Sequence, residues 1–308
     1  MSMPTDGLPT LLIPLDGSAA AESVLPAAIT LTQRLPARVT LLHTIERDAP
    51  AQVHGEPHLR READAAAYLQ GVAARLADAG VAVTWHVHEA PVGNVPRNIA
   101  AHAAEEPTAL IVLSTHEVTD PRAWLMGAVA QGVIRYAAPP VLLLRTGKQQ
   151  PTAFAPGEVI VALDGEGHGE AAIPGAVGLA RALGVPLRLL AVVPTADTLP
   201  GDHAAAARLL PSGAAAALDL EAKAVASDLA TLTARLRAQE PGLSIVPEIM
   251  RGDPAPTIIA AARAHNAVIA LATHGRTGLD ALWSASIGAR IIARAPGPFL
   301  LVHPEAGG

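Results

Sequence analysis

The sequence contains no cysteine, very few aromatic residues and almost no lysine. The lack of cysteine excludes disulfides, thiolate catalysis and cysteine-based zinc sites. Aromatic residues make up only 2% of the chain, so its cores must be built from aliphatic side chains. Lys148 and Lys223 are the only lysines, and neither lies in the glycine-rich context that a P-loop requires.

Strong positive charge and long apolar runs are also lacking. The net charge of −6 gives no basic footprint, so we expect no nucleic-acid partner. No apolar run approaches the ~18–20 residues that span a bilayer. The first residues, MSMPTDGLPT, lack the charged and apolar regions of a signal peptide. We therefore expect a soluble cytoplasmic protein with no membrane partner.

What the chain does contain is a repeat of itself. Three segments recur in the same order: LLIPLDGS (11–18) as VIVALDG (159–165), LIVLSTHE (110–117) as VIALATHG (268–275), and APPVLLL (138–144) as APGPFLLV (295–302). The offset between the copies grows from 148 to 158 positions, which places an insertion near residues 197–217. The repeat predicts two copies of one domain, residues 1–146 and 157–308, joined by a linker at 147–156.

Short apolar segments alternate with helical patterns in both copies. The predicted strands are 10–15, 38–45, 81–88, 109–114 and 141–145 in the first copy, and 158–163, 186–193, 244–250, 267–272 and 298–302 in the second. Alternating strands and helices require crossover connections, and apolar strands require cover on both sides. The prediction is an α/β protein with two tandem doubly wound domains, each a five-stranded parallel sheet with helices on both faces.

Ligands of open parallel sheets bind beyond the carboxyl ends of the strands. Asp16 and Asp164 end the first strand of each copy, and His116 and His274 follow the fourth. A loop and a new helix come next, and a helix N-terminus offers free N–H groups to a phosphate. The alternative is structural: the aspartates cap helices or shape turns, and the histidines bond to backbone groups.

Two motifs of the second copy suggest a family. Ala272-Thr273-His274-Gly275 is followed, after nine residues, by Ala285-Ser286, and the second motif is Gly252-Asp253-Pro254. With these motifs the chain resembles a tandem universal stress protein over nearly its whole length. Nucleotide-binding members of that family carry G-x2-G-x9-G-S/T after the fourth strand and an aspartate after the first. The second copy keeps the middle glycine and the final hydroxyl, with alanine at the outer two glycines.

The resemblance implies that the second domain binds an adenine nucleotide, with ATP as the ligand and Mg²⁺ accompanying it, in a stress response. Asp164 would contact the ribose, and the backbone of Val192 would recognise adenine. The phosphates would lie among Ala272, His274, Gly275, Ala285, Ser286 and Ile287, and Ala162 and Leu271 complete the predicted site. No general base or metal cluster is evident in the sequence, so we predict no catalytic residue.

The first copy departs further from the motif, reading Ser114-Thr115-His116-Glu117 and then Gly127-Ala128. Glu117 replaces the glycine that would face the phosphates, and its carboxylate would repel them. The degenerate counterpart of the site comprises Asp16, Thr44, Ser114, His116, Glu117, Gly127 and Ala128. A rival hypothesis is a nucleotide-free interaction module with decayed sites. Ala272 and Ala285 favour that rival, whereas Gly275, Ser286 and Asp164 oppose it.

Two further kinds of site are considered and not predicted. His86 and His88 lie on one face of a strand, and His54 and His58 are four residues apart, so either pair could hold a metal. Neither pair has evident carboxylate support. The glycines at 165, 167 and 169 are one residue short of a dinucleotide fingerprint, and no acidic residue ends the second strand.

The last strand of each copy, Val141–Leu144 and Phe299–Val302, would leave an open sheet edge, which proteins usually cover or pair. Single-domain universal stress proteins commonly dimerise through this region, so the resemblance implies an internal pseudo-dimer. The same pairing could extend to a homodimer of tandem chains.

Overall fold

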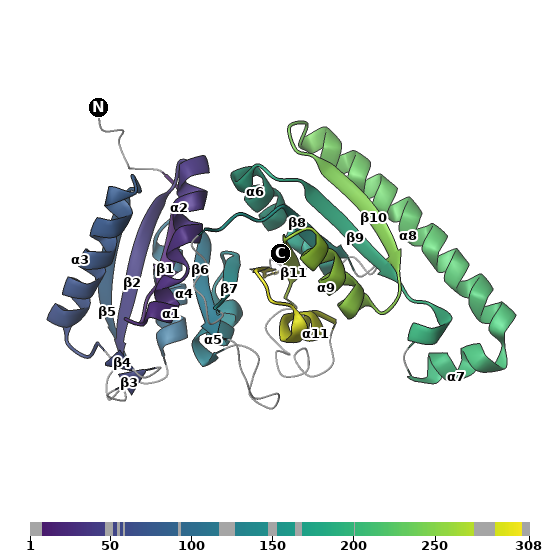
Figure 1. The fold of residues 1–308 in the computed structure, drawn as a ribbon, viewed down its shortest axis with the longest axis horizontal. Coiled ribbons are helices and arrows are strands. Elements are labelled where there is room, and N and C mark those ends of the chain that lie inside the picture. Colours follow the sequence, from purple (N-terminus) through teal and green to yellow (C-terminus); the bar gives the residue numbers. More distant parts are fainter. Residues whose placement is uncertain are drawn as a thin grey trace. The chain divides into compact units, whose positions relative to one another are not determined.

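The computed structural model describes residues 8–46, 52–53, 56–57, 59–91, 94–116, 127–146, 153–163, 168–199, 201–273 and 287–303. The chain divides into two compact units, Met1–Ala155 with Gly297–Gly308, and Pro156–Pro296. Each unit combines parallel strands with helices (Figure 1), so the α/β fold class is as predicted. Residues 147–152 of the predicted linker lie outside the described residues.

The first unit contains the five strands predicted for the first copy. They are β1 (Thr10–Pro14), β2 (Arg38–Glu46), β5 (Val83–Ala90), β6 (Thr108–His116) and β7 (Val141–Thr146). All pair in parallel in the order β5–β2–β1–β6–β7. A small antiparallel pair, β3 (Gln52–Val53) with β4 (Glu56–Pro57), precedes the first long helix.

Helices cover both faces of this first sheet. They are α1 (Ala19–Glu22), α2 (Leu25–Arg34), α3 (Glu62–Asp78), α4 (Val95–Glu105) and α5 (Ala128–Tyr136). His43 of β2 bonds the carbonyl of Leu59, just before α3, whereas its neighbour Thr44 bonds Asn98 of α4. Because successive strand residues point to opposite faces, α3 and α4 lie on opposite sides of the sheet.

The second unit repeats this strand order. Its strands are β8 (Glu158–Leu163), β9 (Leu187–Val193), β10 (Ile245–Arg251) and β11 (Ala267–Ala272), all parallel in the order β10–β9–β8–β11. Helix α6 (Ile173–Leu183) connects β8 to β9, α9 (Pro254–Ala264) connects β10 to β11, and α11 (Ile287–Arg294) follows β11. Two short 3-10 turns, η1 (His168–Ala172) and η2 (Ala196–Thr198), precede α6 and follow β9. The repeat found in the sequence is therefore a repeat of topology.

The insertion of the second copy is helical. Helix α7 (Gly201–Leu209) lies in the predicted stretch, and α8 (Pro211–Gln239) follows it directly. Helix α8 has 29 residues, whereas its counterpart α3 has 17. The alanine-rich segment 214–217 belongs to α8 and favours a helix by propensity.

The fifth strand of the second copy joins the first unit. Strand β12 (Phe299–Val302) pairs antiparallel with β7, with Phe299 opposite Leu143 and Leu301 opposite Val141. All four residues are buried, and Phe299 is the largest fully buried side chain of the described residues. The last strands of the two copies therefore pair with each other.

The cores follow from the composition. Buried side chains are overwhelmingly Leu, Ile, Val and Ala, as in Leu11, Leu12 and Ile13 of β1. These three residues are buried in succession, which fits a strand covered on both faces. Within the described part of the chain, no helix is both long enough and apolar enough to cross a membrane.

Candidate functional site

The predicted site of the second unit begins where β8, β9 and β11 end. Strand β8 lies between the other two and is parallel to both. Strands β8 and β11 last pair with each other at Val161 and Ala270, and Ala162 and Leu271 are the next residues of these strands. Val192 is the second-last residue of β9 and is partly exposed. The structure therefore brings Ala162, Leu271 and Val192 to one edge of the sheet.

The chain passes from β8 to β9, which pairs with one side of β8, whereas β11 pairs with the other side of β8. Such a reversal of strand order opens a crevice at the carboxyl edge of an open sheet. Asp164 directly follows β8, and the segment 273–286 connects β11 to α11. Ala272 is the half-buried last residue of β11, and Ile287 is the exposed first residue of α11. Asp164, His274, Gly275, Ala285 and Ser286 lie outside the described residues.

The Gly-Asp-Pro element is built into the same edge. Gly252 has φ +144°, a conformation that side chains disfavour, and a Cβ there would lie 2.9 Å from the hydroxyl of Thr257. The N–H of Gly252 donates to the carbonyl of Val193 at 3.1 Å, which fixes the turn against the end of β9. Asp253 is the N-cap of α9 and Pro254 its first residue. Only glycine fits at position 252 without strain.

Asp253 also connects two helices. Its carboxylate Oδ2 accepts a hydrogen bond from Nη2 of Arg290 on α11 at 2.5 Å, with both side chains about one-third exposed. Arg290 is in the first turn of α11, which is the helix that follows the predicted phosphate loop. The pair therefore anchors the start of α11 beside the start of α9.

In the first unit, Asp16 shapes a turn. Its Oδ1 accepts hydrogen bonds from the N–H of Ser18 at 2.9 Å and from the Ser18 hydroxyl at 2.6 Å. Ser18 in turn caps α1 by accepting from the N–H of Ala21 at 3.1 Å. Gly17 between them has φ +94°. These hydrogen bonds are those of a turn-shaping aspartate, which is the structural alternative raised from the sequence.

The other predicted residues of the first unit are distributed around the same edge. Thr44 is buried near the end of β2 and donates to Oδ1 of Asn98 at 3.0 Å. Ser114 is half-buried in β6, and His116 is the last residue of that strand. Gly127 and Ala128 are the N-cap and first residue of α5. Glu117 lies outside the described residues.

A second constellation lies under α4 in the first unit. His86 of β5, His102 of α4 and Glu106, which ends α4, offer ligand atoms that all lie within 4.8 Å of one another. The ring of His88 also lies 4.8 Å from that of His102. Burial lowers the pKa of His102, and His88 and His86 lower it further, whereas Glu106 and Glu105 act in the opposite direction. The lowered pKa of His102 favours the neutral form of its ring.

Only part of this cluster is evident from the sequence. His86 and His88 lie on one face of a predicted strand, without evident carboxylate support. Glu106 is that carboxylate, 3.9 Å from Nε2 of His86. The spacing of His102 and Glu106, four residues apart near a helix end, was the signal that sequence reasoning missed.

Comparison with known proteins finds the two copies of the repeat. A protein-family model described as the universal stress protein family matches residues 8–145 and again residues 157–303. No curated protein matches the sequence.

Two solved structures are similar in fold over nearly the whole chain, and a third matches part of it. A universal stress protein from Archaeoglobus fulgidus DSM 4304 has 17% identity and a TM-score of 0.68, over 96% of this chain and 98% of its own. A putative universal stress protein from Pseudomonas aeruginosa UCBPP-PA14 has 17% identity and a TM-score of 0.62, over 98% and 95%. A universal stress protein from Archaeoglobus fulgidus in complex with dAMP covers 44% of this chain and 96% of its own, with 20% identity and a TM-score of 0.33. The chain belongs to the universal stress protein family and carries two of the family's domains in tandem.

Proposed function

We propose that the second domain binds an adenine nucleotide, ATP with Mg²⁺, and that the protein acts in a stress response through this binding. One observation carries the proposal. Asp164 and the segment that starts at Ala272 follow two adjacent parallel strands, β8 and β11, at the point where the strand order reverses. Ligands of open α/β sheets occupy this crevice.

The residue types at this edge suit a nucleotide. Gly275 allows a close approach of backbone to phosphate, and Ser286 offers a hydroxyl directly before α11. The free N–H groups and positive dipole end of a helix favour an anion there. In the proposed site, Asp164 holds the ribose and the backbone of Val192 recognises adenine. Ala162, Leu271, Ala272, His274, Ala285 and Ile287 complete its lining.

The Gly252-Asp253-Pro254 element is hydrogen-bonded to two elements of the proposed site. It is bonded to the end of β9, where adenine would lie, and through Arg290 to α11, where phosphate would lie. One turn therefore contacts both the strand end proposed to bind adenine and the helix proposed to bind phosphate. Such support keeps a binding site in one geometry and lowers the entropic cost of binding.

The first domain is proposed not to bind nucleotide. The Oδ1 atom of Asp16 is engaged by Ser18, and Glu117 takes the position that Gly275 has in the second domain. Two like charges at ~4 Å cost about 1 kcal/mol in water and more at lower dielectric. We therefore expect one nucleotide per chain.

The competing proposal is a nucleotide-free interaction module. Alanine at positions 272 and 285, where the motif has glycine, favours it. The pairing of β7 with β12 would serve either function. We infer from it an internal pseudo-dimer of the two domains, and a homodimer of tandem chains is the alternative assembly.

Calorimetric titration of the full chain with ATP and Mg²⁺ tests the proposal. The variant Gly275→Glu copies the loop of the first domain into the second and should weaken binding at least tenfold. The matched variant Glu117→Gly changes the first domain and should leave the affinity of the second unchanged. Equal affinity of Gly275→Glu and the wild type, with folding intact by circular dichroism, would favour the interaction module or another site.

A further inference from the structure

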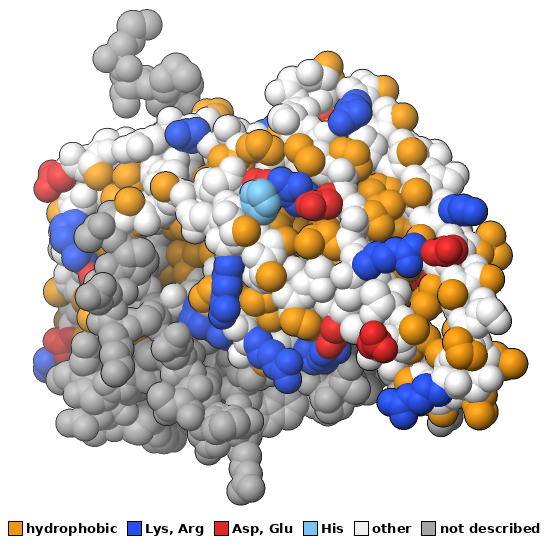
Figure 2. Space-filling view, turned by 45° about the vertical axis from the view of Figure 1, so that its right-hand side comes forward, with side chains coloured by type: hydrophobic (Ala, Val, Ile, Leu, Met, Phe, Trp, Pro, Cys, Tyr) orange, Lys and Arg blue, Asp and Glu red, His pale blue; other side chains and the backbone are white. Residues whose placement is uncertain are grey.

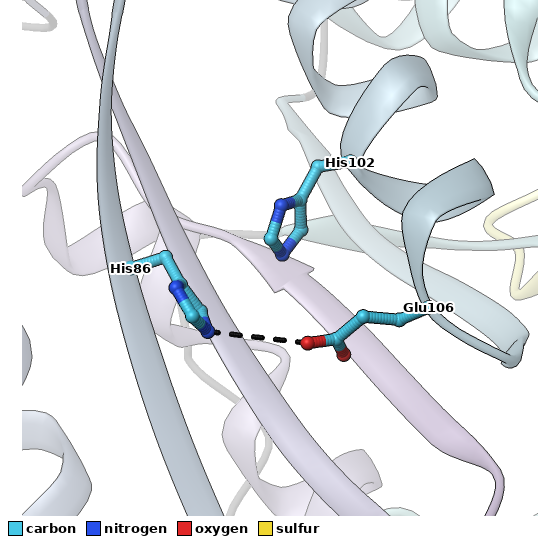
Figure 3. Close-up of side chains that lie close together, drawn as sticks. All are labelled: His86, His102 and Glu106. Atoms are coloured by element: carbon cyan, nitrogen blue, oxygen red, sulfur yellow. Dashed lines mark ion pairs between the residues drawn. The ribbon is translucent and has the colours of Figure 1, made fainter.

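The cluster under α4 joins three side chains from neighbouring elements. Figure 3 shows His86 on β5 and Glu106 at the end of α4, with His102 between and above them. One nitrogen of the His102 ring points toward the gap between the other two side chains. Nε2 of His86 lies 3.9 Å from Oε1 of Glu106. Three potential ligand atoms therefore converge on one space.

His102 is the buried member of the cluster. It is only 4% exposed, and neither ring nitrogen has a hydrogen-bond partner among the described residues. A buried polar group without a partner costs about 1–3 kcal/mol. The carboxylate of Glu105 lies 3.6 Å from Nδ1 of His102. A carboxylate behind one ring nitrogen orients the other nitrogen toward a metal in many metal sites.

Glu106 is held so that one oxygen remains directed at His86. Its Oε2 accepts from the hydroxyls of Thr40 at 3.2 Å and Thr10 at 3.5 Å, and it lies 3.5 Å from Nη2 of Arg38. Its Oε1 faces His86 instead. The first strands of the sheet thus fix the carboxylate by one oxygen and leave the other to the cluster.

The second domain has a different arrangement at the equivalent place. His86 pairs in register with Leu42, and the equivalent position opposite Leu190 is Glu248. Arg188 donates hydrogen bonds there to the carboxylate of Glu248 at 2.7 Å and to that of Glu158 at 2.8 and 2.9 Å. Figure 2 shows acidic and basic side chains next to one another on one face of the molecule. The cluster is therefore specific to the first domain and is no requirement of the fold.

We propose that the first domain binds a divalent transition-metal ion through His86, His102 and Glu106. Two imidazoles and one carboxylate are a ligand set that Zn²⁺ accepts, with the fourth position open to water. Bonds of ~2.0–2.2 Å to a tetrahedral Zn²⁺ require small side-chain rotations from the present separations. His86 is half-exposed on the edge strand β5, so an ion can enter from solvent.

Zinc binding to the chelator-treated full chain tests the proposal, without any nucleotide present. Competition with a chromophoric chelator should show one tight Zn²⁺ site per chain. His86→Ala and Glu106→Gln should each weaken that site at least tenfold, and the double variant should abolish it. Co²⁺ bound in place of Zn²⁺ should show visible absorption of a tetrahedral complex, which both variants lose.

The control variant is His265→Ala. His265 is equally exposed and lies 3.9 Å from Glu158 in the second domain, but it belongs to no group of three potential ligands among the described residues, so its loss should leave zinc affinity unchanged. Because His102 is buried, the test relies on the more exposed His86 and on the isosteric change at Glu106. The proposal is overturned if the wild type binds no stoichiometric Zn²⁺, or if both His86→Ala and Glu106→Gln bind it with wild-type affinity.

Discussion

Arg290 on α11 donates a hydrogen bond to Asp253, the N-cap of α9, at 2.5 Å. This pair holds the helix that follows the proposed phosphate loop against the Gly-Asp-Pro turn. We expect Asp253→Ala to release the start of α11 and to lower ATP affinity by up to about tenfold, or about 1.4 kcal/mol. Titration calorimetry measures the effect.

The control for this variant is Glu240→Ala. Glu240 pairs with Arg181 in the same unit, but that pair joins the ends of α6 and α8 at the opposite edge of the sheet. It should leave ATP affinity unchanged. If Asp253→Ala behaves like Glu240→Ala, then α11 does not position the phosphates.

Gly252 provides a prediction about stability. Gly252→Ala forces a side chain into φ +144° and against Thr257, so we expect the second unit to lose about 1–3 kcal/mol. Gly178 in α6 is the matched control, because a Cβ there has no atom within 4 Å. Gly178→Ala should be neutral or should stabilise the helix by up to about 1 kcal/mol. Urea unfolding measures both, and equal stabilities would disprove the strain.

Tyr68 on α3 provides a prediction about pH. Burial raises the pKa of its hydroxyl well above the ordinary 10.0, and the carboxylate of Glu22 raises it further. The folded state therefore keeps a proton that the unfolded state loses, so stability is complete below pH ~10 and is lost as the pH rises above it. Tyr68→Phe should reduce this loss.

Ultraviolet titration in the background Tyr136→Phe follows Tyr68 alone, since the chain has two tyrosines. Phenolate absorbance should appear only together with the loss of circular dichroism. Reversible ionisation near pH ~10 in a folded protein would contradict the burial of this hydroxyl.

The antiparallel pairing of β7 with β12 predicts that an engineered disulfide can form between these strands. Val141 and Leu301 are register partners, and the chain has no cysteine of its own. Val141→Cys with Leu301→Cys should therefore oxidise to a bond within one chain, because directly opposite residues lie ~4.5–5.5 Å apart. The diagonal pair Leu143→Cys with Leu301→Cys should oxidise poorly at ~7–8 Å. Non-reducing electrophoresis distinguishes a bond within one chain from a bond between two chains. A disulfide-linked homodimer would contradict the internal pseudo-dimer.

The sequence predicted the strands well because each is a short apolar run between turn residues. Strands β8 and β11 have the predicted bounds, 158–163 and 267–272. The insertion was found only as a change of spacing, since length alone does not distinguish a loop from helix α7 and a longer α8. Strand β12 pairs with β7, which is distant in the sequence. The sequence suggested this pairing only because both strands were expected to leave open sheet edges.

The candidate sites were predictable to a smaller extent. Ala162, Val192 and Leu271 were predicted to lie together because each is near the carboxyl end of a strand, and the carboxyl ends of parallel strands lie at one end of the sheet. Whether Asp16 binds a ligand or shapes a turn depends on the side-chain rotamer, which a motif does not specify. The cluster of His102 with His86 depends on how α4 packs on β5, a tertiary contact that sequence spacing does not encode.

Native mass spectrometry of the full chain with ATP and Mg²⁺ tests the central claim most directly, since it counts the ligands on each molecule. We predict one ATP per chain in the wild type and a strongly reduced occupancy in Gly275→Glu at the same ATP concentration. Two nucleotides per chain would contradict the proposed difference between the domains. An ATP-free wild type would contradict nucleotide binding by the second domain.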